Sequence, residues 1–184
     1  MIDDETRKAI CVIDLDTVMP GLAVNDFGDS IRFGASTAEE DERDLSKVSC
    51  SMELFELYTK GFIEGCQGSL TEAELEMLPV GAMTMTYECG MRFLTDYLEG
   101  DHYFKVHRDG HNLDRARTQF TLVKDMEEKL ETMNAIVKKY GFSKSILTSL
   151  QVSIAFPPPT ANIISACRTA SNCSNFFALL KVHS

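Results

Sequence analysis

The stretch LDRARTQFTLVKDMEEKLETMNAIVKKY, residues 113–140, decides the fold class of this chain. Its apolar residues recur every three or four positions, which is the spacing of one face of an α-helix. They are Leu113, Ala116, Phe120, Val123, Met126, Leu130, Met133 and Val137. We expect one long amphipathic helix here, with Asn112 as its N-terminal cap. Its apolar face predicts packing on the body of the chain, although a dimer interface would show the same pattern.

Other segments also carry helix signals. Ser51 precedes the apolar-rich residues 52–64 as a cap, and Thr71 with Glu74 forms the capping-box pattern that opens another helix. Residues 22–33 and 83–98 are further helix candidates, the second apolar enough to be packed on several sides. The sequence therefore predicts a mainly α fold.

A short β-hairpin is expected at the start of the chain. Residues 9–16, AICVIDLD, are rich in β-branched residues and predict a strand. Met1 and Ile2 would be the end of its partner strand, across a turn at residues 3–6.

Composition limits the class of protein. The chain has 184 residues and a formal net charge of −10, which fits one soluble domain and argues against a nucleic-acid binder. No stretch approaches the roughly 20 apolar residues of a membrane span, and residues 1–20 are too acidic for a signal peptide. The six cysteines include no CxxC pair. We expect reduced thiols in a cytoplasmic protein, with no nucleic-acid or membrane partner and an oligomeric state that the sequence leaves open.

The composition changes near residue 140. All 28 acidic residues lie between Asp3 and Glu131, and the triple proline 157–159 follows in the acid-free remainder. We therefore divide the chain into a domain of residues 1–140 and a tail of residues 141–184. The tail is open to reading as a linker, as an extra subdomain, or as translation out of register, which we favour. We expect it to be poorly ordered.

Two groups of residues could bind metal ions. Asp14 and Asp16 stand two positions apart at a strand end, so both carboxylates project to one side, as a Mg²⁺ ion carrying phosphates would require. Capping of the following turn is an equal alternative. For His102, His107 and His111, solvated loop histidines are the better interpretation than a metal site, since no cysteine lies beside them.

Several motifs resemble one family. VIDLDTVMPG (12–21) and DFGDSIR (26–32) closely resemble the aminoglycoside phosphotransferase and choline kinase superfamily. RFLTDYL (92–98) and HRDGHNLDRAR (107–117) are most similar to the N-acetylhexosamine 1-kinases within it. The resemblance covers residues 1–140 and implies part of a protein-kinase-like C-lobe.

The resemblance also implies roles for particular residues. Asp14 would be the metal ligand and Asp16 an accessory ligand, with Mg²⁺ and ATP as the cofactors of the full-length family. Asp26 would be structural, because in the family it bonds to the catalytic-loop backbone. Its alternative role, with Asp29, is compensation of the helix dipole.

Three residues match positions that contact the hexosamine in that family: Arg92, Tyr103 and, more weakly, Phe33. An arginine can hold sugar hydroxyls and an aromatic ring can cover a sugar face. Alternatively, Arg92 pairs with Glu88 or Asp96 one helical turn away, and Tyr103 is a loop anchor.

The printed sequence contains no Gly-rich phosphate loop, no nucleotide-lobe lysine and no H-x-D-x-x-x-x-N catalytic loop. We therefore expect a fragment of an ATP-dependent sugar phosphotransferase that is inactive alone and takes a small sugar and a nucleotide. The alternative is a non-catalytic helical sugar-binding or interaction module derived from that fold.

Overall fold

The computed structural model describes residues 1–141 except 2, 9, 12, 14 and 17, and these residues form five α-helices and one 3-10 helix. The predicted mainly α fold is confirmed for these residues. The elements are α1 (Ala23–Gly34), η1 (Leu45–Lys47), α2 (Met52–Gly65), α3 (Glu72–Glu99), α4 (His111–Glu128) and α5 (Leu130–Gly141). The predicted tail, from residue 142 on, lies outside the described residues.

Two of the predicted helix caps, Ser51 and Thr71, are confirmed. The Ser51 hydroxyl accepts a hydrogen bond from the Leu54 N–H at 3.3 Å, so α2 begins where its cap predicts. The Thr71 hydroxyl accepts from the Glu74 N–H, and the Glu74 carboxylate accepts from the Thr71 N–H, which completes the capping box of α3. Capping chemistry therefore fixes the starts of both helices.

The prediction of separate helices between residues 71 and 98 is wrong, because α3 is one helix of 28 residues that runs through Pro79. A proline inside a helix removes one backbone hydrogen bond. Pro79 is buried, as are Leu78 and Ala82 beside it. The packing of this segment on α1 and α5 offsets the missing bond, so tertiary contacts override the local helix-breaking signal.

The single helix predicted over residues 113–140 is also wrong, because it is divided at Lys129 into α4 and α5. The ammonium group of Lys129 donates hydrogen bonds to the Asp125 carboxylate at 2.7 Å, to the Ser49 hydroxyl at 2.7 Å and to the Cys50 carbonyl at 3.0 Å. These contacts hold the chain at the break and turn α5 toward α2. There the Glu56 carboxylate accepts from Lys139 and Tyr140.

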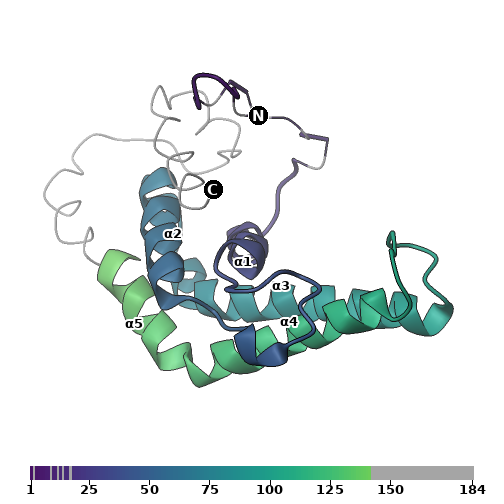
Figure 1. Cartoon of the computed structure of the whole chain (residues 1–184). Helices are drawn as coiled ribbons and strands as arrows, with labels where there is room; N and C mark the ends of the chain where they lie inside the picture. Colours follow the sequence, from purple (N-terminus) through teal and green to yellow (C-terminus); the bar gives the residue numbers. More distant parts are fainter. Residues whose placement is uncertain (2, 9, 12, 14, 17, 142–184) are drawn as a thin grey trace, which may run out of the picture.

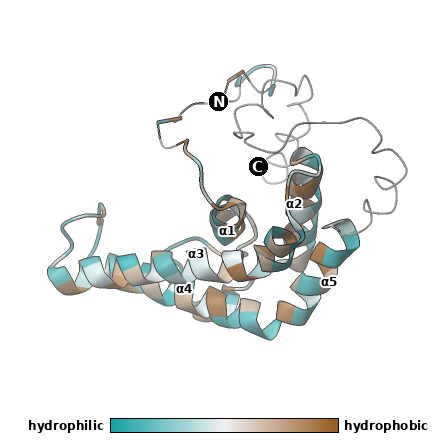
Figure 2. Cartoon of the chain, turned by 180° about the vertical axis from the view of Figure 1, so that it is seen from behind, coloured by the Kyte–Doolittle hydropathy of each residue, from teal (hydrophilic) through white to brown (hydrophobic). Residues whose placement is uncertain are grey.

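The helices form two groups that share one core (Figure 1). Helices α3 and α4 run side by side, α2 and α5 stand at one end of them, and α1 packs on α3. Hydropathic colours alternate along the helices, as expected of amphipathic segments (Figure 2). The largest completely buried side chains of the core include Phe27, Phe55, Leu78, Leu122 and Met126. The loop of residues 100–110 joins α3 to α4 at the end far from α2 and α5.

The predicted hairpin involves residues 9, 12 and 14, which lie outside the described residues, so it stays a prediction. Described residues near them join the first residues of the chain to residues 8 and 10 through backbone hydrogen bonds. The Asp3 N–H donates to the Lys8 carbonyl at 2.9 Å, and the Ile10 N–H donates to the Met1 carbonyl at 3.0 Å. Of the described helices, none combines the length and the apolar character that crossing a membrane requires.

Asp125 gives the fold a defined acid sensitivity. Burial raises the pKa of this carboxyl, but the Lys129 ammonium and the Cys50 N–H outweigh burial and hold the pKa below its ordinary value of 3.8. A depressed folded-state pKa contributes stability at pH values above the unfolded-state pKa, and this contribution is lost as pH falls through the folded-state pKa. We expect Asp125→Asn to flatten the fall in unfolding free energy below about pH 4.

Urea denaturation at a series of pH values measures this slope. The control is Asp109→Asn, which removes an exposed carboxylate that has no hydrogen-bond or ion-pair partner among the described residues. A wild-type slope in Asp125→Asn, or equal flattening in both variants, would contradict the assignment to Asp125.

Candidate functional site

Arg92 and Tyr103, two of the three residues expected to contact a sugar, lie together although they come from different elements. Arg92 is on α3 and Tyr103 is in the loop of residues 100–110. The guanidinium carbon of Arg92 is 5.7 Å from the centre of the Tyr103 ring and 5.4 Å from that of Phe104. These distances are within the range of cation–π attraction. The Tyr103 side chain is 74% exposed, so it is available to a ligand.

A chain of aromatic contacts supports this pair from behind. The Tyr103 and Phe104 rings meet edge to face with centres 4.8 Å apart, and the Phe104 and Phe93 ring centres are 4.6 Å apart. Phe93 is buried, and the Arg115 guanidinium lies over its ring at 5.4 Å. Phe93 and Phe104 were missed as site residues. Their only sequence signal is adjacency to Arg92 and Tyr103, since the burial of Phe93 on α3 indicates core packing and Phe104 lies in a loop, which has no periodicity.

Arg92 also makes the helical pairing that the sequence offers. Its Nε lies 3.7 Å from a Glu88 carboxylate oxygen, and both side chains are nearly half exposed. Such a surface pair contributes little stability, roughly 0–1 kcal/mol. Asp96, the other suggested partner, forms no hydrogen bond or ion pair with Arg92 and instead binds the loop. The guanidinium edge is thus held weakly, which leaves it able to exchange Glu88 for a ligand.

Asp96 organises the loop that carries Tyr103. Its Oδ1 accepts hydrogen bonds from the N–H groups of His102 at 2.9 Å and Tyr103 at 2.7 Å. Its Oδ2 accepts from the Phe104 N–H at 2.9 Å and from the Asn112 amide at 2.8 Å. Burial raises the pKa of Asp96, yet the bonds from these backbone N–H groups hold the pKa below its ordinary value. The carboxylate is therefore kept charged.

The prediction that Asn112 caps the following helix is wrong. The cap position of α4 is Gly110, whose φ of 69° lies in the left-handed region that glycine tolerates. Asn112 is inside the helix and completely buried. Its amide Nδ2 donates to Asp96 and, at 2.8 Å, to a carboxylate oxygen of Asp101. The sequence does not distinguish an asparagine that bonds to two carboxylates inside a helix from one that caps it, because both use the same side-chain amide.

Phe33 and Asp26 lie on α1. Phe33 is 74% exposed and takes part in no aromatic pair within the described residues. In particular, Phe33 makes no aromatic or cation–π contact with Arg92 or Tyr103. Asp26 is exposed in the first turn of α1, where a carboxylate compensates the helix dipole. Asp29 pairs with Arg32 at 3.0 Å one turn later. The proposed bond from Asp26 to a catalytic loop stays a prediction.

The carboxylate pair expected to bind Mg²⁺ is only partly visible, because Asp14 lies outside the described residues. Asp16 is exposed and makes no hydrogen bond or ion pair with another described residue. Within the described part of the chain, no three His, Cys, Asp or Glu side chains converge as a metal site would need. The metal site at Asp14 and Asp16 therefore stays a prediction.

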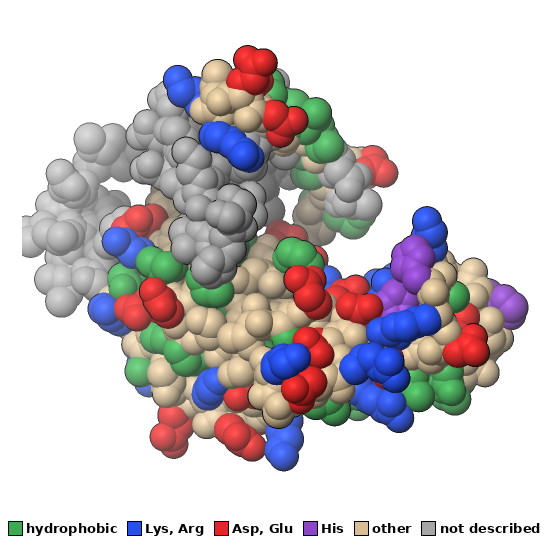
Figure 3. All heavy atoms as spheres, viewed as in Figure 1, with side chains coloured by type: hydrophobic (Ala, Val, Ile, Leu, Met, Phe, Trp, Pro, Cys, Tyr) green, Lys and Arg blue, Asp and Glu red, His purple; other side chains and the backbone are tan. Residues whose placement is uncertain are grey.

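The prediction of three solvated histidines is right for His102 and His107 and wrong for His111. His111 is only 4% exposed. Its Nε2 lies 2.9 Å from an Asp41 carboxylate oxygen, and its Nδ1 accepts from the His107 N–H at 3.2 Å. Both ring nitrogens are occupied, so His111 serves to fix the loop before η1 against α4. Histidine and basic side chains gather at this end of the molecule (Figure 3).

The cysteines whose surroundings are described behave as structural groups. Burial raises the pKa of Cys50 to about 12 and that of Cys66 to about 11, so neither thiol ionises near neutral pH. Cys50 is buried, Cys66 and Cys89 are half-buried, and Cys11 is exposed. Of these four, Cys50 alone is packed in the core as a small hydrophobe.

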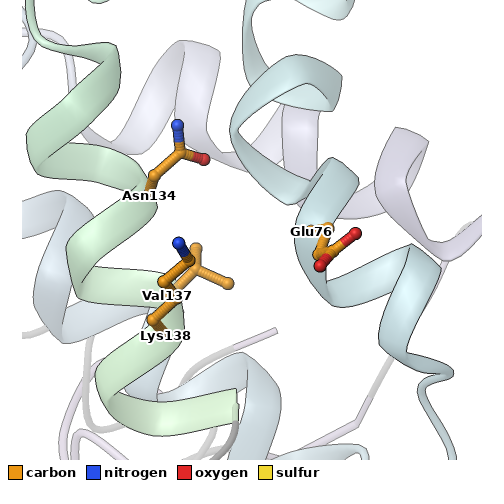
Figure 4. Close-up of a pocket in the computed structure, with 4 residues that line it drawn as sticks. All are labelled: Glu76, Asn134, Val137 and Lys138. Atoms are coloured by element: carbon orange, nitrogen blue, oxygen red, sulfur yellow. The ribbon is translucent and has the colours of Figure 1, made fainter.

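Two shallow pockets lie elsewhere on the surface. One, of about 210 Å³, is lined by Glu76 of α3 and by Asn134, Val137 and Lys138 of α5, which face one another across it (Figure 4). The other is an open groove between α3 and α4 near Tyr87 and Phe120. Neither is lined by Arg92 or Tyr103, and the first is smaller than most small-molecule sites. The Arg92–Tyr103 pair lies at the surface, with Tyr103 74% exposed and the Arg92 side chain nearly half exposed.

Comparison with known protein families adds no assignment: a search against family models found none that matches the chain.

Proposed function

We propose that the chain is the sugar-binding part of an ATP-dependent sugar phosphotransferase resembling the N-acetylhexosamine 1-kinases. One observation carries the proposal. Arg92 and Tyr103, which the resemblance names as sugar contacts, are eleven positions apart in sequence and share one exposed surface, with the guanidinium 5.7 Å from the ring centre. A shared sugar-binding role requires that proximity.

The chemistry of this surface suits a hexosamine. The exposed face of Tyr103 can cover the apolar face of a sugar ring. The Arg92 guanidinium has donors along its edge, which can reach ring hydroxyls or an amide carbonyl once the 3.7 Å contact with Glu88 is given up. The aromatic contacts to Phe104 and Phe93 fix both groups before a ligand arrives. Less side-chain freedom is then lost on binding.

The alternative proposal is a non-catalytic sugar-binding module that uses the same surface. It is favoured by the motif content of the printed sequence, which holds the sugar-side residues without the Gly-rich loop or H-x-D-x-x-x-x-N motif. Both proposals predict that the chain incubated with Mg-ATP and N-acetylglucosamine or N-acetylgalactosamine gives no sugar phosphate by mass spectrometry, and product would contradict both. The coding DNA upstream of residue 1 separates them, because an H-x-D-x-x-x-x-N motif there supports the phosphotransferase.

Calorimetric titration with the two sugars tests the binding site itself. We expect Arg92→Ala and Tyr103→Ala each to weaken binding by roughly 10-fold or more, the effect of losing a hydrogen bond to a charged group or a stacking face. Matched controls are Arg117→Ala and Tyr87→Ala, which are exposed residues on α4 and α3 outside the site. Equal losses in the controls, or wild-type affinity in both site variants, would refute the assignment.

A further inference from the structure

The loop that carries Tyr103 is tied to a single buried carboxylate. Asp96, 4% exposed, accepts hydrogen bonds from three successive backbone N–H groups, those of His102, Tyr103 and Phe104. The backbone N–H of Asp101 donates to the backbone carbonyl oxygen of Asp96 at 2.8 Å. No other described side chain bonds to those three N–H groups. Without Asp96 the loop would lose all of these side-chain restraints together.

The backbone conformation explains why a carboxylate is needed. Gly100 has a φ of 102° and Asp101 a φ of 60°, so the chain reverses direction immediately after α3 and folds back over the helix end. The reversal aims consecutive N–H groups at one point. A carboxylate presents only acceptors there, whereas an asparagine would turn an NH₂ donor toward at least one N–H donor.

Helix α4 braces the same arrangement. The Asn112 side-chain amide donates to Asp96 and to Asp101, and its oxygen Oδ1 accepts a hydrogen bond from the Arg115 guanidinium at 3.1 Å. Arg115 also donates to the Lys105 carbonyl at 3.2 Å, and its guanidinium covers the Phe93 ring. Asp96 is therefore also held by a side chain of α4, independently of its bonds to the loop backbone. Its position fixes that of the loop rather than following it.

We propose that Asp96 is a positioning residue for the sugar surface: it sets the loop so that the Tyr103 and Phe104 rings flank the Arg92 guanidinium. Asp96 is buried and bonded to the loop backbone, so it acts through Tyr103 and Phe104 and does not touch the ligand. The consequence for sugar affinity rests on the proposed function. The consequence for the loop does not.

The test compares Asp96→Asn with two matched variants. Asp101→Asn alters a carboxylate that contacts Asn112 only, at a positive φ that asparagine tolerates. Asp125→Asn alters a carboxylate that also accepts a backbone N–H, from Cys50, but far from the loop, and so controls for a general loss of stability. Three quantities are measured in the full chain: amide hydrogen exchange at residues 102–104, the chemical shift of the Arg92 Nε–H, and calorimetric affinity for N-acetylglucosamine.

We expect Asp96→Asn to speed exchange at residues 102–104 by about 10-fold or more and to weaken sugar binding by a similar factor, since it removes charge-assisted hydrogen bonds. The Arg92 Nε–H should move toward its shift in an unstructured peptide as the rings leave. Neither matched variant should show this combination.

Each outcome decides a separate point. Unchanged exchange and an unchanged Arg92 shift in Asp96→Asn would overturn the positioning role, whatever happens to the sugar. A loosened loop with wild-type affinity, while Arg92→Ala weakens binding, would also overturn it and leave the proposed function standing. If the wild-type chain binds no sugar, the proposed function fails, and the exchange and shift data alone decide whether Asp96 sets the loop.

Discussion

Phe27→Ala is expected to lower the free energy of unfolding by about 3–5 kcal/mol, the usual cost of removing a buried aromatic ring. Phe27 is completely buried on α1. Its ring centre lies 5.8 Å from that of Phe55, 5.8 Å from that of Tyr58 and 5.2 Å from that of Phe62, all on α2. Alanine would leave a cavity between the two helices and remove these aromatic contacts at once.

Phe33 provides the matched control, because it is on the same helix and is 74% exposed. Phe33→Ala should change the unfolding free energy by no more than about 0.5 kcal/mol. Urea denaturation measures both variants, and the midpoint should shift in Phe27→Ala without a change in slope. Similar losses in the two variants would show that α1 is not packed through Phe27.

Gly28→Ala should destabilise the chain by about 1–3 kcal/mol, although alanine is the better helix former by about 1 kcal/mol. A Cβ on Gly28 would meet the backbone carbonyl of Gly81 on α3. The converse holds as well, since a Cβ on Gly81 would come within 2.5 Å of the Val24 carbonyl oxygen. The α1 and α3 backbones thus touch at a pair of glycines, and neither can move away without opening the core.

Gly34→Ala is the control for helix propensity, because a Cβ there would meet nothing within 4 Å. It should leave stability unchanged or raise it by up to about 1 kcal/mol. Thermal unfolding of the two variants side by side makes the comparison. A stabilised Gly28→Ala would mean that α1 and α3 do not approach as closely as described.

The fold could be predicted from sequence wherever the signal is local. Ser51 and Thr71 mark the starts of α2 and α3 because a hydroxyl and a backbone N–H three positions apart suffice to cap a helix. The continuation through Pro79 and the break at Lys129 could not be predicted. Pro79 is tolerated because packing of α3 on α1 and α5 offsets the backbone hydrogen bond it removes. The break depends on the contacts of Lys129 with Ser49 and Cys50, about 80 positions away.

The candidate site divides in the same way. Arg92 and Tyr103 could be named because they match sugar-contacting positions of the resembled family, and the structure brings them together. Phe93, Phe104 and Asp96 could not, because their roles depend on the chain reversal at residues 100–101 and on which N–H groups it directs at one carboxylate. The buried His111 was missed for a related reason, since its partner Asp41 comes from a distant loop.

The central claim is that a hexosamine binds at Arg92 and Tyr103, and a titration followed residue by residue tests it most directly. Proton–nitrogen spectra that include the arginine Nε–H groups are recorded as N-acetylglucosamine is added. We predict saturable shifts of the Arg92 Nε–H and of the Tyr103 and Phe104 amides with one common dissociation constant, and none at Arg117. Shifts confined to the groove at Tyr87 and Phe120, or no saturable shift at Arg92, would contradict the claim.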